Sequence, residues 1–132
     1  AWDWGPCFLT QGVWQSATIH AFSDAVIQYV APQIVPTSSD SLASWNVDVD
    51  VWLLPASVEV VGSVSASVYG TSTKIDDVQL SGLTPITVHL HLSIESLPAS
   101  ELWWPRGYGE QPLHPLTVSF VPSTNSSAIQ QE

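Results

Sequence analysis

Residues 45–53 of this 132-residue chain, Trp-Asn-Val-Asp-Val-Asp-Val-Trp-Leu, contain its most regular pattern. The odd-numbered positions carry Trp, Val, Val, Val and Leu, whereas the even-numbered positions carry Asn, Asp, Asp and Trp. Successive side chains of a β-strand point to opposite sides, so this segment would have one apolar face and one mostly polar face. A strand with one buried and one wet face is typical of antiparallel sheets. The segment therefore predicts an antiparallel strand.

The same period of two recurs on both sides of this segment. Residues 86–94 alternate apolar positions with Thr, His, His and Ser, which predicts a second strand of the same kind. Residues 58–69 alternate around Gly62, so they form either one long strand with a bend there or a hairpin arm that begins after it. Further strands are expected at residues 13–22, 25–35, 75–80 and 116–121, with turns at 70–74 and 81–82.

The fold class follows from these segments together. Pro32 and Pro36 suit an edge strand, because proline cannot donate to a ladder of hydrogen bonds. No segment has helical periodicity of useful length. Short strands at this spacing are typical of an all-β chain folded as an antiparallel β-sandwich.

Composition limits the classes of partner. Only Lys74 and Arg106 are basic, against twelve acidic residues, and the net charge is -10 with neutral histidines. Nucleic acids are excluded, because their phosphates are bound by many lysines and arginines. Anionic membrane surfaces are disfavoured for the same reason, and no apolar run reaches the roughly 20 residues of a membrane span.

Several polar residues invite a functional interpretation that the sequence alone does not support. Asp48 and Asp50 share a strand face and could form a metal or acid/base pair, but such carboxylates are usually solvated. His89 and His91 could hold zinc, but a zinc site needs further ligands and no third ligand is recognisable. We therefore expect all four to be surface residues, with no metal and no cofactor.

Two further residues are informative about the cellular compartment of the protein. Cys7 is the only cysteine, so no disulfide can form within the chain, and a small buried apolar role is expected. Asn125-Ser126-Ser127 fits the N-glycosylation pattern. Together with the acidic balance, this triplet favours a secreted glycoprotein.

Near the start, Trp2-Asp3-Trp4-Gly5-Pro6 is followed by a third tryptophan, Trp14. Indole rings either pack in a core or form a platform for the apolar face of a ligand. Sugars have such faces, and a carboxylate between two indoles could accept their hydroxyl hydrogens. The physics alone favours core packing, with Asp3 capping a turn, because buried aromatic residues are ordinary core material.

A second tryptophan-rich segment covers residues 102–113, Leu-Trp-Trp-Pro-Arg-Gly-Tyr-Gly-Glu-Gln-Pro-Leu. Its prolines and glycines exclude a regular strand or helix, so it predicts a long loop of defined shape. Loops on rigid sandwiches often carry binding residues. Loops with aromatic residues and arginine are also typical interface anchors, and we favour an inter-domain contact for this one.

These two segments resemble the β-mannosidases of glycoside hydrolase family two. Residues 2–6 and 10–14 are similar to the end of the family's sugar-binding jelly-roll domain, and residues 102–113 are similar to a loop of the immunoglobulin-like domain that follows. Their order and separation match the family. The resemblance implies the last strand or strands of a jelly roll at residues 1–23, an immunoglobulin-like antiparallel β-sandwich lacking its final strand at 24–122, and a flexible tail at 123–132.

The resemblance also implies an activity. Such enzymes remove terminal β-linked mannose from the non-reducing end with retention, using two glutamates on a (β/α)-barrel that this chain lacks. No catalytic residue is therefore expected here. By resemblance, Asp3 binds hydroxyls of the terminal mannose, and Trp2 and Trp4 wall or support it.

The tryptophan-rich loop has a separate implied role. By resemblance, Trp103, Trp104, Arg106 and Tyr108 lie where the immunoglobulin-like domain meets the barrel, at the rim of the active site. The expected partners are then the rest of the same enzyme and a mannose-containing glycan, in a secreted or in a lysosomal or vacuolar compartment. Two alternatives remain: a free-standing carbohydrate-binding sandwich and a structural immunoglobulin-like interaction module.

Overall fold

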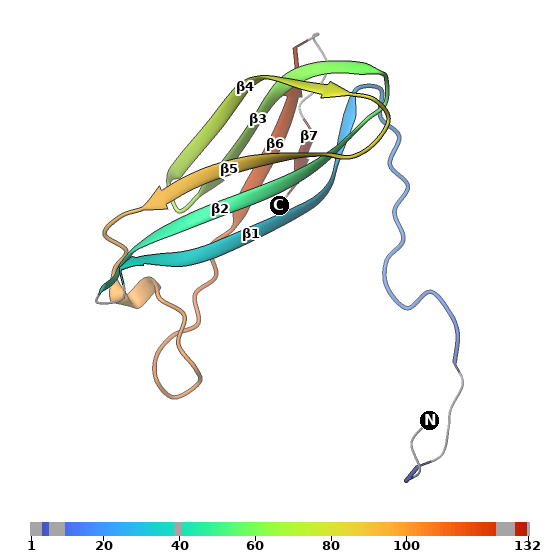
Figure 1. Ribbon diagram of the computed structural model, residues 1–132. Coiled ribbons are helices and arrows are strands. Elements are labelled where there is room, and N and C mark those ends of the chain that lie inside the picture. The colour runs from blue at the N-terminus through green and yellow to red at the C-terminus, as the bar shows by residue number, and fades with distance from the viewer. Residues whose placement is uncertain (1–3, 6–9, 39–40, 124–128, 132) are drawn as a thin grey trace.

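The computed structural model describes residues 4–5, 10–38, 41–123 and 129–131, and these residues form an antiparallel β-sandwich (Figure 1). One sheet contains three strands and the other contains four, which confirms the predicted all-β class. The strands are β1 (Ala25–Ser38), β2 (Ser41–Pro55), β3 (Glu59–Val68), β4 (Thr71–Ser81), β5 (Ile86–Ile94), β6 (Leu116–Pro122) and β7 (Ile129–Gln131), and a 3-10 turn η1 spans Ala99–Glu101.

The strand order is that of an immunoglobulin-like sandwich with one strand moved. The sheets run β1-β2-β5 and β4-β3-β6-β7, and each hydrogen-bonded pair is antiparallel. In the constant-type immunoglobulin fold the fourth strand pairs in the sheet of the first, second and fifth strands. Here β4 instead pairs with β3, because the two are joined by a tight hairpin at Tyr69 and Gly70.

The core lies between the inner faces of the two sheets. In the three-stranded sheet, β2 and β5 pair with Val49 opposite Leu90, so the apolar positions of both strands point inward. The alternation predicted for residues 45–53 and 86–94 is thereby confirmed. The most deeply buried side chains are Val47, Val49, Val51, Leu53, Val64, Leu80, Val118 and Phe120.

Gly62 lies in one continuous strand, β3, with a register shift between Gly62 and Val64. This confirms the bent-strand alternative over the hairpin arm. A Cβ atom at residue 62 would lie 2.5 Å from Cε2 of Phe120 and 2.6 Å from the carbonyl oxygen of Val121. The glycine is therefore required so that the aromatic ring of β6 can pack directly on the backbone of β3.

β1 is an edge strand, as its prolines predict. It pairs only with β2, and Pro32 lies opposite Val49 within the ladder. The strand continues past Pro36 to Ser38, which is further than the expected end at residue 35. A register shift between Ile27 and Tyr29 leaves Gln28 as an extra residue, which is a β-bulge.

The hairpin between β3 and β4 differs from the expectation. Residues 70–74 were expected to form a turn, but the turn consists of Tyr69 and Gly70, and β4 begins at Thr71. Tyr69 has φ 46° and Gly70 has φ 76°. Two successive left-handed residues form the tight hairpin turn that matches the twist of antiparallel strands, so no longer loop is needed.

The segment before the sandwich does not form the strand expected at residues 13–22. It runs as an extended stretch away from the two sheets (Figure 1), and the side chains of Trp14 and Ile19 are 85% and 99% exposed. A strand requires a neighbour to complete its hydrogen bonds, and no described segment lies beside this one.

The end of the chain also differs from the expectation. Ile129–Gln131 forms β7, which pairs with Val118–Phe120 of β6, where a flexible tail was expected at residues 123–132. The hydrogen bonds that join two strands connect backbone groups and do not require apolar side chains. The polar composition of residues 123–132 therefore did not reveal this strand. None of the described elements is a helix with the length and apolarity needed to cross a lipid bilayer.

Replacing Gly62 with alanine should destabilise the sandwich by about 1–3 kcal/mol, because the new methyl group overlaps the Phe120 ring and the backbone of β6. The free energy of unfolding in urea measures this loss. Gly12→Ala is the matched control, because nothing lies within 4 Å of its new methyl group. Equal stability of the two variants would contradict the packing argument.

Candidate functional site

The amino-terminal motif lies only partly within the described residues. Trp2 and Asp3, two of the predicted sugar-binding residues, fall outside them. Trp4 is 87% exposed and Trp14 is 85% exposed. The interpretation that these indoles pack the core of this sandwich is therefore wrong for Trp4 and Trp14, while the role of Asp3 stays a prediction.

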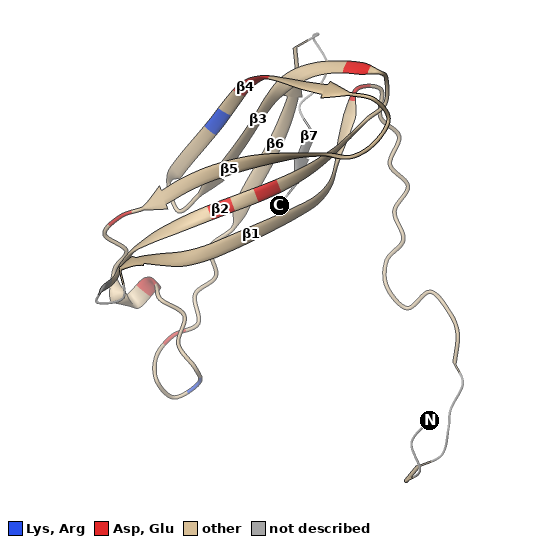
Figure 2. Ribbon diagram, viewed as in Figure 1, with Lys and Arg blue, Asp and Glu red and all other residues tan. Residues whose placement is uncertain are grey.

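The tryptophan-rich loop projects from one end of the sandwich, between β5 and β6 (Figure 1). The backbone N–H of Tyr108 donates to the carbonyl oxygen of Pro105 at 3.0 Å, and Gly107 between them has φ 92°. A positive φ at the third position, with a hydrogen bond across the turn, indicates a type II turn. This turn forms the tip of the loop, where Arg106 is the only basic residue (Figure 2).

The base of this tip is closed by a second contact. The backbone N–H of Trp104 donates to the carbonyl oxygen of Glu110 at 2.9 Å. A Cβ atom at residue 109 would lie 2.7 Å from Cδ1 of Trp104, so the indole packs directly on the backbone of Gly109. The loop is therefore a shaped element, as its prolines and glycines predict.

The structure brings the predicted rim residues into one loop but leaves them uncovered. The side chains of Trp103, Trp104 and Tyr108 are 56%, 36% and 83% exposed, and Arg106 is also exposed. Exposed aromatic residues beside an arginine are typical of residues that become buried at an interface.

An apolar groove of about 330 Å³ lies between this loop and the end of the sandwich. Trp45 stands in its wall and is held there by a hydrogen bond from Nε1 to the carbonyl oxygen of Leu42 at 2.8 Å. Leu113, which also lines the groove, is 86% exposed. The other lining residues are Pro32, Ile34, Val47, Val68, Ile94, Leu97, Glu101, Leu102, Trp103, Pro112, His114 and Leu116.

His114 ties the returning end of the loop to η1. Its Nε2 donates to the carbonyl oxygen of Glu101 at 3.0 Å, and its ring meets that of Tyr69 edge-on with centroids 4.9 Å apart. The sequence alone suggested no role for this histidine. Its structural role was not foreseen, because Glu101 and Tyr69 are brought together with it only by the fold.

A polar hollow of about 470 Å³ lies on the loop itself. Arg106 and Glu110 supply its charged groups, with donors and acceptors from Ser100 and Gln111. Such a lining can hydrogen-bond a polyol or the polar rim of a partner protein.

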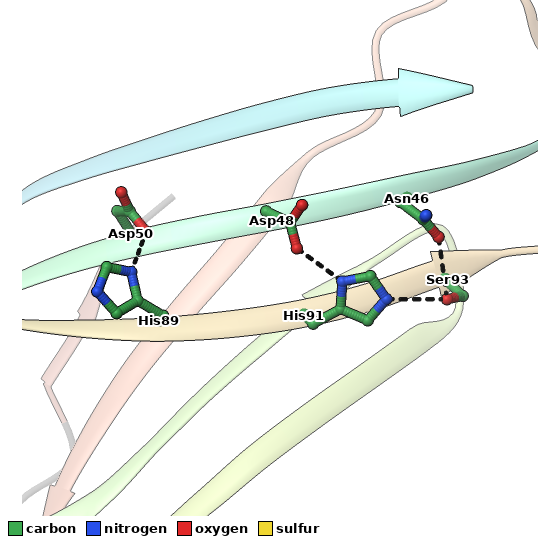
Figure 3. Close-up of polar contacts among 6 residues, drawn as sticks. All are labelled: Asn46, Asp48, Asp50, His89, His91 and Ser93. Atoms are coloured by element: carbon green, nitrogen blue, oxygen red, sulfur yellow. Dashed lines mark hydrogen bonds and ion pairs between the residues drawn. The ribbon is translucent and has the colours of Figure 1, made fainter. Parts of the chain in front are cut away.

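The outer face of the β1-β2-β5 sheet carries a second cluster, which Figure 3 shows. Asp50 Oδ1 lies 2.5 Å from Nδ1 of His89, and Asp48 Oδ1 lies 2.6 Å from Nδ1 of His91. Ser93 Oγ donates to Asn46 Oδ1 at 3.3 Å. We call the two Asp–His pairs, together with the adjoining pair of Asn46 and Ser93, the Asp–His ladder.

The ladder was not recognised from the sequence, although its aspartates and its histidines were each noted separately. The register of β2 and β5 places Asp48 opposite His91 and Asp50 opposite His89. The available signal was the polar alternation in residues 45–53 and 86–94, but pairing two strands far apart in the chain needs the sheet topology. The prediction that these four residues lie at the surface is confirmed.

Metal binding has no support in the described residues, where no group of three or more His, Cys, Asp and Glu is arranged to hold an ion. In the ladder each histidine nitrogen Nδ1 is already paired with one carboxylate. Two other residues named from the sequence, Cys7 and the predicted glycosylation site Asn125, lie outside the described residues.

Comparison with known proteins shows that this chain is similar to β-mannosidases. It is 31% identical to the mouse enzyme over 92% of the chain, 30% identical to the goat enzyme over 90%, and 31% identical to β-mannosidase A of Aspergillus oryzae over 96%. The aligned part covers 14%, 13% and 15% of those proteins, so the chain spans about one-seventh of their length. No protein-family model matches the chain.

A solved structure supports the fold. An exo-chitosanase from Amycolatopsis orientalis superposes on 77% of this chain, and on 12% of its own, with a TM-score of 0.55. The sequence identity is 21%, so this likeness concerns the sandwich and not its chemistry.

Replacing Gly109 with alanine should open the tip of the loop, because the new methyl group would displace the Trp104 indole. We expect hydrogen-exchange protection of the Trp104 amide to fall by about tenfold or more, which corresponds to roughly 1.4 kcal/mol. Gly107→Asn is the control, because asparagine tolerates a left-handed conformation and nothing lies within 4 Å of the new Cβ. Unchanged protection in Gly109→Ala would contradict the proposed packing.

Proposed function

This chain is homologous to one segment of the β-mannosidases, and from this premise we propose that it is a non-catalytic part of a retaining exo-β-mannosidase. Such an enzyme removes terminal β-linked mannose from the non-reducing end of oligosaccharides and glycoproteins. The observation that carries the proposal is the alignment of about nine-tenths of the chain with mammalian and fungal enzymes of that name. The ordered pair of tryptophan-rich motifs supports it.

The catalytic groups would lie in another part of the polypeptide. Retaining hydrolysis uses two carboxylic acids about 5 Å apart, one as acid/base and one as nucleophile. The described glutamates of this chain are spread over separate elements. Glu59 begins β3, Glu95 follows β5, Glu101 ends η1 and Glu110 lies in the loop. This spread supports a catalytic pair on a (β/α)-barrel outside this chain.

The loop formed by residues 102–113 would dock against that barrel at the rim of the active site. Its tip is shaped by the contact between Trp104 and Gly109 before any partner arrives, so little ordering is required on docking. Trp103 and Tyr108 supply exposed aromatic area, and Arg106 supplies a planar group that pairs with carboxylates. The adjoining apolar groove would receive a side chain from the barrel.

Asp3 would bind hydroxyls of the terminal mannose, with Trp2 and Trp4 beside it. A carboxylate accepts hydrogen bonds from two hydroxyls at once, and indole faces suit the C–H groups of a sugar. The exposure of Trp4 is what this role requires, because a residue buried in the sandwich could not reach a substrate.

The remaining features fit a two-domain arrangement in a secreted, lysosomal or vacuolar enzyme. Residues 1–23 would belong to a jelly roll whose other strands would cover the exposed Trp14 and Ile19. Asn125 would carry a glycan in a secreted, lysosomal or vacuolar enzyme.

In the complete enzyme, Asp3→Asn should lower kcat/KM for a β-mannoside by about 10- to 100-fold, because a hydrogen bond to a charged group contributes about 1.5–3 kcal/mol. The melting temperature should change little. Asp77→Asn is the control, since Asp77 is an exposed carboxylate on β4 whose φ of 55° asparagine also adopts. Activity of Asp3→Asn equal to that of the control would remove Asp3 from the site.

Tyr108→Ala should separate docking from folding. The side chain is 83% exposed in this chain, so the stability of the 132-residue chain should stay within about 0.5 kcal/mol of the parent. In the complete enzyme, loss of an interface aromatic should cost about 1–2 kcal/mol and lower the inactivation temperature.

Leu83→Ala is the matched control for this test, because Leu83 is 63% exposed in the turn between β4 and β5, away from the loop. If Tyr108→Ala and Leu83→Ala inactivate at the same temperature in the complete enzyme, the loop does not dock.

A further inference from the structure

Two aromatic side chains stand at one end of the outer face of the β1-β2-β5 sheet. Tyr29 lies opposite Trp52 in the register of β1 and β2, and their ring centroids are 5.3 Å apart at an angle of 52°. The bulge at Gln28 produces this pair, because Ile27 points into the core and the extra residue lets Tyr29 point outward two positions later. Tyr29 remains 61% exposed.

The Asp–His ladder continues from this aromatic pair along the same face. Asp50 is two residues from Trp52 on β2, so their side chains are about 7 Å apart along the strand. Asp48 follows at the same interval, and each carboxylate faces a histidine on β5 (Figure 3). The result is a row in which aromatic rings come first and paired hydrogen-bonding groups follow.

The pairing leaves defined groups turned to solvent. The carboxylates use Oδ1 toward their histidines, and Oδ2 of Asp50 has no bond to another described residue. His89 is bound to Asp50 through Nδ1, and its side chain is 75% exposed. Its Nε2 makes no hydrogen bond to another described residue. With Nδ1 donating to the carboxylate, Nε2 is left to hydrogen-bond a hydroxyl group, which can both donate and accept.

We propose that this outer face of the β1-β2-β5 sheet binds an uncharged oligosaccharide. One sugar ring stacks on Tyr29 beside Trp52, and its hydroxyl groups form hydrogen bonds with Asp50 Oδ2 and His89 Nε2. The next ring along the chain meets the pair of Asp48 and His91. This site needs no group from outside the chain and does not depend on the proposed enzyme.

The charges on this face favour an uncharged ligand. Lys74 and Arg106 lie on β4 and on the loop, so the ladder has no permanent cation nearby, and its carboxylates repel sulfated or phosphorylated ligands (Figure 2). Each carboxylate already faces an imidazole, which weakens the case for a basic protein partner. A neutral polyol with an apolar ring face complements both parts of the row.

The test is an NMR titration of the 15N-labelled 132-residue chain with β-1,4-linked mannohexaose. We expect shifts at the amides of Tyr29, Asp50 and His89 and at the Trp52 indole, with a Kd near the millimolar range. Tyr29→Ala and His89→Gln should each weaken binding by about tenfold. Both side chains are exposed, so both variants should keep the dispersed spectrum of the folded parent.

Asp77→Asn is the control, because it changes an exposed side chain on β4 in the other sheet and should leave this binding unchanged. Absence of shifts with about 10 mM sugar, or shifts confined to the loop, would overturn the proposal. So would burial of the Tyr29 and His89 side chains in the complete polypeptide without sugar, measured by side-chain footprinting, since another segment would then cover the face. The kinetics of Asp3→Asn test the enzyme assignment separately, whatever this titration gives.

Discussion

The register between β2 and β5 is the constraint on which the rest of this structure depends. With Val49 opposite Leu90, the apolar positions of both strands enter the core and the polar positions line up outside. A shift of one residue would bury Asp48 and Asp50 and expose four large aliphatic side chains. Burying unpaired carboxylates is so costly that a register shifted by one residue is incompatible with a folded sandwich. The same register creates the Asp–His ladder, so the core and the outer polar face have one cause.

A second constraint acts through missing side chains. Gly62 lets the Phe120 ring rest on β3, and Gly109 lets the Trp104 indole rest on the backbone of the loop. In both places an aromatic ring occupies the space that a Cβ atom would need. The first contact closes the core across two strands, and the second gives the loop a defined shape. Packing of this kind links the stability of the domain to the geometry of its exposed site.

Homology and structure contribute different parts of the functional argument. The alignment with β-mannosidases covers most of the chain but about one-seventh of those enzymes, so it identifies the chain as similar to one segment of such an enzyme. The structure adds two exposed apolar surfaces: an extended stretch with exposed tryptophans at one end of the chain, and an aromatic loop beside an apolar groove at one end of the sandwich. Exposed apolar surface of this kind is typical of interaction sites.

The sequence by itself determined the all-β class, the faces of the two strands at residues 45–53 and 86–94 and the irregular loop at residues 102–113, but it left open whether Gly62 bends a strand or precedes a hairpin arm. These features are local, because the period of two and the effects of proline and glycine act within a few residues. The tertiary structure alone decided that β4 pairs with β3, that residues 13–22 have no neighbour among the described segments to form a strand with, and that Asp50 meets His89. Each of these depends on which distant segment lies alongside, and backbone hydrogen bonds and cross-strand contacts carry no local signature of their partner.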